Sequence, residues 1–148
     1  MYETRAGDKP NIQASGEPAY FKSTDGHFGN WNFNLRRPNL HLLPLIIQRH
    51  GLVFHINTLM SGDWIQLIFQ MCRMILVDST RAGKRIPDAL SKTVPIWCAV
   101  INRAISRLRP EAPEWPLELY TPPGAVSEQE HTQIERRIDS WADSLAVR

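Results

Sequence analysis

The sequence predicts an α/β fold in which a small sheet is flanked by helices. Three observations lead to this prediction. A short apolar run at 74–77 resembles a buried strand and leads directly into a polar, glycine-containing loop. Apolar residues at helical spacing follow over 96–108 and again over 127–145. Because strand, loop and helix in this order are the building unit of α/β proteins, we expect such a unit at the centre of the fold.

The amino-terminal part divides into a lead-in and a turn-containing segment. Residues 1–18 are rich in Gly, Pro, Ser and charge and show no periodicity, so we expect a flexible lead-in. The region 19–148 would form the folded part. Within it, Asp25-Gly26 is a strong signal for a tight turn between two extended pieces. The sequence therefore predicts polar groups displayed on a turn near residue 25.

The two expected helices have recognisable starts. The first has Ser91 or Thr93 available as a cap before Pro95. Its predicted apolar stripe is Trp97, Val100, Ala104, Ile105 and Leu108. The second begins at Ser127, with capping-box spacing to Glu130. Its stripe is Ile134, Ile138, Trp141 and Leu145, which we expect to pack on the core or on a partner.

Composition limits the location and the partners. A net charge of +2 does not by itself indicate a polyanion partner. The most apolar window, 64–77, is shorter than the ~20 residues of a membrane span. The first ten residues lack the apolar middle of a secretion signal, and the two cysteines make no disulfide framework. We expect no membrane association and a cytoplasmic location.

The loop 78–85 contains the largest group of side chains able to bind phosphate. A strand leading through a glycine-containing turn into a helix lets backbone N–H groups converge on an anion. Hydroxyl, backbone and cationic donors for a phosphate would come from Ser79, Thr80, Arg81, Gly83, Lys84 and Arg85. Five residues separate Ser79 from Arg85, as in the Cys-x5-Arg loop of tyrosine phosphatases. Without the cysteine no thiolate nucleophile exists, and a solvated basic turn remains the alternative interpretation.

Two further clusters are candidates for function. Asp25 and His27 could form an acid/base pair, although this composition is also typical of a structural turn. Arg36 and Arg37 could contact an RNA backbone with Trp31 close by for stacking, or could lie on a solvated edge. The remaining histidines have no metal-type spacing, so no protein metal site is assigned.

Three segments carry a family resemblance: YFKSTDGH, RRPNLHLL and VDSTRAGKRIPDALSKTVPIWCAVINR. Together they closely resemble the initiator tRNA phosphoribosyltransferase family of fungi and plants. The resemblance implies transfer of a phosphoribosyl group from phosphoribosyl pyrophosphate to the 2′-hydroxyl of a T-stem adenosine in cytosolic initiator tRNA. It thereby implies initiator tRNA as the partner, while no protein partner is identifiable. It also implies a phosphatase-like architecture, which agrees with the Ser79-to-Arg85 spacing.

The resemblance also suggests roles for individual residues. The loop from Ser79 to Arg85 would cradle donor phosphates. Asp25, His27 or Asp78 would orient or deprotonate the attacking hydroxyl. Mg²⁺ is expected as a pyrophosphate partner held mainly by the donor's own oxygens, with Asp88 as one assisting candidate.

Two departures from the family pattern lead to alternatives. Residues 52–73 interrupt the family blocks and are almost free of ionic charge, which indicates either an anomalous insertion or a gene-model artefact. Family enzymes are also longer and have a carboxy-terminal phosphatase-like domain, which we expect to be absent. The alternative functions are therefore an inactive fragment that binds tRNA or phosphate, and a serine-for-cysteine pseudophosphatase.

Overall fold

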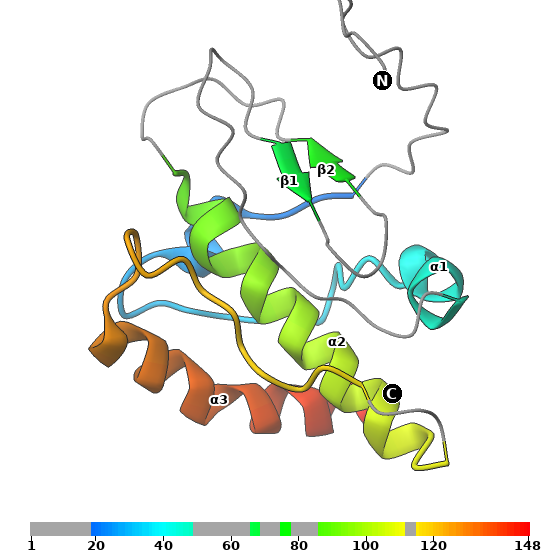
Figure 1. The fold of residues 1–148 in the computed structure, drawn as a ribbon. Coiled ribbons are helices and arrows are strands. Elements are labelled where there is room, and N and C mark those ends of the chain that lie inside the picture. The colour runs from blue at the N-terminus through cyan, green and yellow to red at the C-terminus, as the bar shows by residue number, and fades with distance from the viewer. Residues whose placement is uncertain (1–18, 49–65, 69–74, 78–85, 112–114) are drawn as a thin grey trace, which may run out of the picture.

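A computed structural model describes residues 19–48, 66–68, 75–77, 86–111 and 115–148 of the chain (Figure 1). The described helices are two short 3-10 turns, a π-helical turn and three α-helices. In chain order they are η1 (Ser23–Gly26), η2 (Leu40–Leu42), α1 (Leu43–Gln48), η3 (Ala89–Thr93), α2 (Val94–Leu108) and α3 (Glu128–Ala146). The described strands are β1 (Gln66–Ile68) and β2 (Ile75–Val77).

Helix α2 is the centre of the core. It continues from η3 without a break, with the backbone N–H of Val94 donating to the carbonyl of Ala89, and Pro95 lies in its first turn. The predicted stripe is buried except for Leu108, which is 63% exposed. Residues outside the stripe are buried as well, including Ile96 at 0% and Ile101 at 1% exposed. A helix that is apolar on all sides must be covered on all sides, so α2 needs partners all around it.

Helix α3 covers one side of α2. It begins as predicted, because Ser127 Oγ accepts a hydrogen bond from the backbone N–H of Glu130 at 3.2 Å. Ile134, Ile138 and Ala142 form its fully buried face.

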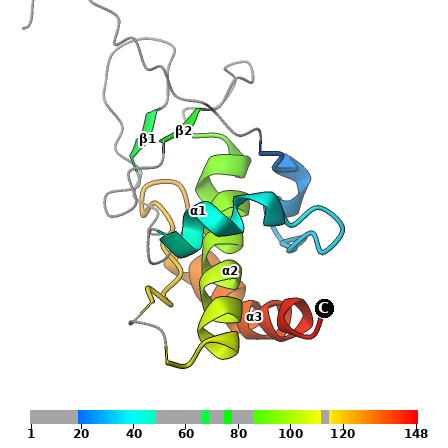
Figure 2. The same ribbon diagram turned by 90° about the vertical axis from the view of Figure 1, so that its right-hand side faces the viewer.

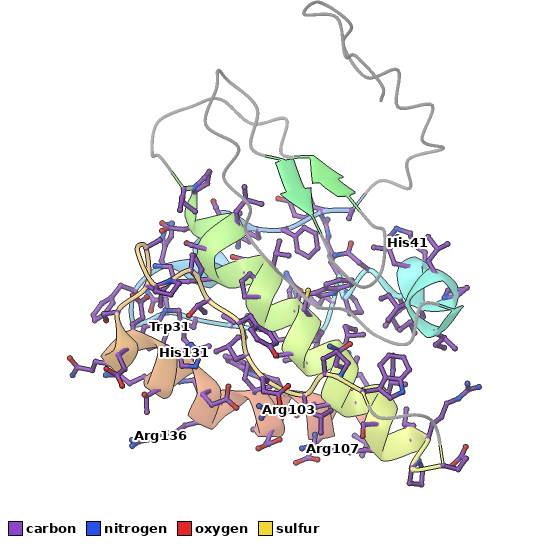
Figure 3. All side chains as sticks on the ribbon, viewed as in Figure 1. Trp31, His41, Arg103, Arg107, His131 and Arg136 are labelled. Carbon is purple, nitrogen blue, oxygen red and sulfur yellow. The ribbon has the colours of Figure 1, made fainter. Side chains whose placement is uncertain are left out.

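A ladder of ion pairs closes the outer edge of the α2–α3 contact. Arg103 pairs with Glu135 and, at 3.2 Å, with Asp139, while Arg107 reaches Asp139 at 2.6 Å and Asp143 at 3.1 Å. Figure 3 shows Arg103 and Arg107 where α2 meets α3.

The segment 19–42 covers another side of α2 without forming a strand in the described residues. Trp31 and Phe33 are buried in the core. The indole N–H of Trp97 donates to the carbonyl of Pro38 at 2.7 Å. Asn39 adopts the left-handed region, with φ of 54°, and its side chain bonds the backbone N–H and C=O of Tyr20, both at 3.2 Å. The predicted turn at Asp25-Gly26 is therefore the 3-10 turn η1, and no described strand flanks it.

The predicted α/β fold class is wrong, because the described core consists of helices packed on one another. β2 coincides with the strand expected at 74–77, but its only described partner is β1, in an antiparallel register that pairs Gln66 with Val77. Neither strand contacts a described helix. Two strands of three residues offer too little surface to carry flanking helices, so α2 takes the central place that the sheet was expected to hold.

Several expectations lie outside the described residues. They concern the lead-in 1–18, the loop 78–85 and most of 52–73. No helix in the described part of the chain is both long and apolar enough to cross a membrane.

Candidate functional site

The turn η1 lies directly against the helical start η3, at the end of α2 that follows the predicted phosphate loop (Figures 1 and 2). Gly26 makes the closest approach. A Cβ at this position would lie 2.7 Å from the backbone oxygen of Asp88 and 2.8 Å from Thr93 Oγ1. Thr93 in turn donates to the carbonyl of Lys22 at 3.3 Å. Glycine is therefore required for the docking of the STDGH turn onto the helix.

Five polar side chains form a continuous row at this junction, which we call the junction cluster. His27 Nε2 lies 3.8 Å from Asp88 Oδ2, and Asp88 Oδ1 lies 3.4 Å from Lys92 Nζ. Lys92 Nζ donates to Glu130 Oε1 at 3.1 Å, and the same oxygen accepts the indole N–H of Trp31 at 3.0 Å. The cluster thus joins the amino-terminal segment, the start of the central helix and the start of α3.

The junction cluster has a buried end and a solvent-facing end. The side chains of Lys92 and Glu130 are 8% and 9% exposed, whereas that of His27 is 50% exposed. Buried charges are tolerated only where they are paired and hydrogen-bonded, and Lys92 lies between two carboxylates. The cluster therefore fixes Asp88 from the inside and leaves the imidazole of His27 accessible from the outside.

The local helix geometry explains the spacing of Asp88 and Lys92. These residues are four apart and face each other across the wide turn η3, a π-helical segment of the kind often found at functional sites. The turn is started by Pro87, whose carbonyl accepts the backbone N–H groups of Leu90 and Ser91 at 3.0 and 2.9 Å.

The structure gives His27 a different acidic neighbour from the one predicted. The sequence suggested Asp25, but the carboxylate placed near the imidazole is that of Asp88. Asp25 is buried, at 8% exposed, and its carbonyl accepts the backbone N–H of Asn32 at 3.0 Å. At 3.8 Å the His27–Asp88 contact is an ion-pair distance rather than a hydrogen bond. Chemically, a solvent-facing imidazole next to a held carboxylate can accept a proton from a bound hydroxyl.

The RNA-binding candidates separate into buried and exposed residues. Trp31 is 3% exposed. The ring of Phe28 stands edge-on to it, with 5.5 Å between the two ring centroids. The guanidinium carbon of Arg137 lies 5.2 Å from the centroid of the Trp31 ring. The position of this tryptophan in the core leaves no open face for a base. Arg36 and Arg37 are exposed, and Arg37 lies over the ring of Tyr20 at 5.4 Å.

A small pocket lies beside the junction. Its walls include Tyr20, Lys22, Asp25, Arg37 and Thr93, and its cavity volume is about 20 Å³. That volume holds about one water molecule, so a nucleotide would have to bind over the pocket rather than inside it.

The remaining site predictions are not placed. Asp78, Ser79, Thr80, Arg81, Gly83, Lys84 and Arg85 all lie outside the described residues. In the described ranges no three His, Cys, Asp or Glu side chains gather as metal ligands would.

Sequence reasoning missed Lys92 and Glu130 as members of a polar cluster. Two signals were available in the sequence: the four-residue spacing of Asp88 and Lys92, and a glutamate at the third position of α3. Nothing local predicts that these groups meet, because Trp31 and Glu130 are 99 residues apart.

Comparison with known proteins identifies the family. A model of the family described as "Rit1 N-terminal domain" matches residues 8–59 and 55–147. The chain belongs to this family. This match confirms the resemblance found in the segments YFKSTDGH, RRPNLHLL and VDSTRAGKRIPDALSKTVPIWCAVINR.

Two curated relatives match most of this chain. A Saccharomyces cerevisiae protein named tRNA A64-2′-O-ribosylphosphate transferase is 42% identical over 129 residues, covering 87% of this chain and 21% of the relative. An uncharacterised protein of Schizosaccharomyces pombe is 43% identical over 127 residues, covering 85% of this chain and 23% of the relative. The chain thus spans only about a fifth of the length of these curated relatives. No solved structure matches it.

Proposed function

We propose that this chain acts as the amino-terminal part of a tRNA 2′-O-ribosylphosphate transferase. The observation that carries the proposal is its 42% identity, over 87% of its length, to a relative named for that activity. The donor would be phosphoribosyl pyrophosphate, and the acceptor the 2′-hydroxyl of an adenosine in tRNA. We further propose cytosolic initiator tRNA as the particular acceptor and the cytoplasm as the location.

The reaction is a displacement at the anomeric carbon of the donor ribose. The acceptor oxygen forms a bond to that carbon, the bond to pyrophosphate breaks with its electron pair, and the hydroxyl proton must be removed. His27 has the accessible nitrogen for this proton, and Asp88, fixed by Lys92, would hold the imidazole in place from 3.8 Å away. Cationic and backbone donors of the loop 78–85 would hold the departing pyrophosphate.

In this proposal Mg²⁺ would be bound by the donor rather than by protein side chains. The carboxylate of Asp88 already faces Lys92 at 3.4 Å and His27 at 3.8 Å, which makes it a poor partner for a further cation. Magnesium binds pyrophosphate oxygens readily and keeps several waters, so it would neutralise charge on the leaving group.

A second candidate function is a binding module without turnover. The short coverage of the relatives favours it, since residues needed for transfer can lie in the four fifths that this chain does not match. Such a module would bind tRNA or donor phosphate through the same surfaces and release both unchanged.

The decisive experiment is transfer of label from phosphoribosyl pyrophosphate to unmodified tRNA. It compares this chain with the full-length relative, and initiator with elongator methionine tRNA. Label on initiator tRNA with this chain supports the transferase, and label only with the longer protein supports the binding module. Absence of transfer by both proteins would refute the proposed activity.

Two substitutions in the active protein assign the roles. His27→Gln should lower turnover at least tenfold and leave tRNA affinity unchanged, because it removes the proton acceptor without removing a cation. His41→Gln is the matched control, an exposed histidine outside the cluster. Arg85→Ala should weaken donor binding, and an unchanged donor affinity would contradict the phosphate-loop hypothesis.

A further inference from the structure

The described cations fall into two groups. Arg103, Arg107 and Lys92 are matched by carboxylates at 3.4 Å or less. In a second group, no carboxylate of the described residues lies within 4.0 Å: Lys22, Arg36, Arg37, Arg109, Arg136, Arg137 and Arg148. Arg36, Arg37, Arg137 and Arg148 border one segment, 30–37, and Lys22 lines the same small pocket as Arg37. We call these five residues the basic rim.

The basic rim is assembled from distant parts of the chain. Arg137 of α3 reaches the carbonyl of Trp31 at 3.5 Å, and Arg148 reaches the carbonyl of Leu35 at 3.3 Å. Arg36 and Arg37 follow in the same segment. Figure 2 shows the blue η1 and the carboxy-terminal end of α3 on the same side of α2. All five rim side chains belong to exposed residues.

Exposed aromatic rings stand at both ends of the rim. Tyr20 is 57% exposed and lies under Arg37, and Phe28 is 73% exposed and lies against Trp31 beside Arg137. Cations that track a backbone, combined with rings on which bases stack, are typical of surfaces that bind single-stranded or looped RNA. An acidic protein segment would use the cations and leave the rings exposed.

We propose that the basic rim binds the phosphate backbone of the tRNA acceptor and that Tyr20 and Phe28 stack on its unpaired bases. This inference rests on the proposed function, which makes RNA the acceptor. It adds Lys22, Arg137 and Arg148 to the contact surface and replaces the buried Trp31 with two exposed rings. Since Phe28 follows His27 directly, RNA bound on the rim would pass close to the solvent-facing end of the junction cluster.

The test is direct binding of unmodified initiator tRNA to the 148-residue chain, by fluorescence anisotropy between 50 and 200 mM salt. Arg36→Ala and Arg137→Ala should each weaken binding roughly fivefold to tenfold, because each removes a charged hydrogen-bond donor to phosphate. Each should also lower the slope of log affinity against log salt by about one. Phe28→Ala should weaken binding without changing that slope.

Arg136→Ala is the matched control. Arg136 is an exposed arginine next to Arg137 in α3, projecting about 100° away around the helix. Its substitution removes the same charge and should change tRNA affinity less than twofold. Circular dichroism of every variant verifies that the fold is kept, and Arg36, whose only described bond comes from its backbone N–H, is the substitution least able to disturb it.

Three outcomes would overturn the proposal. The first is an absence of tRNA binding by the folded chain at 50 mM salt. The second is an equal loss of tRNA affinity in Arg36→Ala and Arg136→Ala. The third is a set of rim variants that no longer bind poly-glutamate but still bind tRNA. The last result would assign the rim to an acidic protein segment. If neither this chain nor the full-length relative transfers label while the rim variants still lose tRNA binding, the proposed activity fails and the RNA surface stands.

Discussion

Lys92→Met is the substitution that most directly tests the junction cluster. Methionine keeps most of the apolar stem of lysine and removes only the charged head group. In the wild type that head group lies 3.1 Å from Glu130 and 3.4 Å from Asp88, with 8% of the side chain exposed. The variant therefore leaves two carboxylates facing each other at the start of α2, one of them almost fully buried.

The expected loss follows from these distances and this burial. At an effective dielectric constant of about 20, a pair of opposite charges 3.1 Å apart attracts by about 5 kcal/mol. Removal of one partner from a buried pair typically costs about 3–5 kcal/mol, since the remaining charge is desolvated without compensation. We expect the variant to lower the free energy of unfolding by about 3–5 kcal/mol. This loss is a large part of the stability of a small domain.

Urea denaturation followed by tryptophan fluorescence measures this loss. The double variant Lys92→Met, Glu130→Gln removes the stranded charge and should recover about 1–3 kcal/mol. Arg107→Met is the matched control, because it breaks ion pairs that are largely solvent-exposed and should cost about 1 kcal/mol or less. A Lys92→Met loss no larger than that of the control would refute the assignment of Lys92 as a buried, essential counter-ion.

Two further changes test the contacts around the cluster. Gly26→Ala should destabilise the protein by about 1–3 kcal/mol in the same urea assay, because the new Cβ would lie 2.7 Å from the Asp88 carbonyl oxygen; unchanged stability would contradict the tight docking of η1. Ser127→Ala should cost about 1 kcal/mol by removing the cap on the Glu130 N–H, and Ser127→Asp should restore it. A loss that aspartate does not restore would show that the hydroxyl acts other than as a cap.

The helices could be predicted because their signals are local. Ser127, the glutamate three residues later and the stripe through Ile134 and Ile138 define α3 within one segment of sequence. The fold class was predicted wrongly because the apolar run at 74–77 was expected to belong to a central sheet. The run from Val94 to Ile101 is apolar on every face, a pattern that indicates a central helix.

The candidate site could be predicted only in part. The turn containing His27 was recognisable from its composition, but the carboxylate beside it comes from Asp88, 61 positions along the chain. Trp31 was expected to stack with RNA because an aromatic near two arginines resembles a stacking surface. Its indole N–H has a buried acceptor on Glu130 instead, a pairing that no local pattern encodes.

The long-range hydrogen bonds of the segment 19–42 also affect when it can fold during synthesis. Trp31 finds its hydrogen-bond acceptor 99 residues later, and the carbonyl of Leu35 finds its donor 113 residues later. At a synthesis rate of about 5–20 residues per second, Trp31 would be on the ribosome for roughly 5–20 s before Glu130 is added. The segment 19–42 is thus synthesised before the helix that supplies these partners, and its aromatic side chains wait for them in the interval.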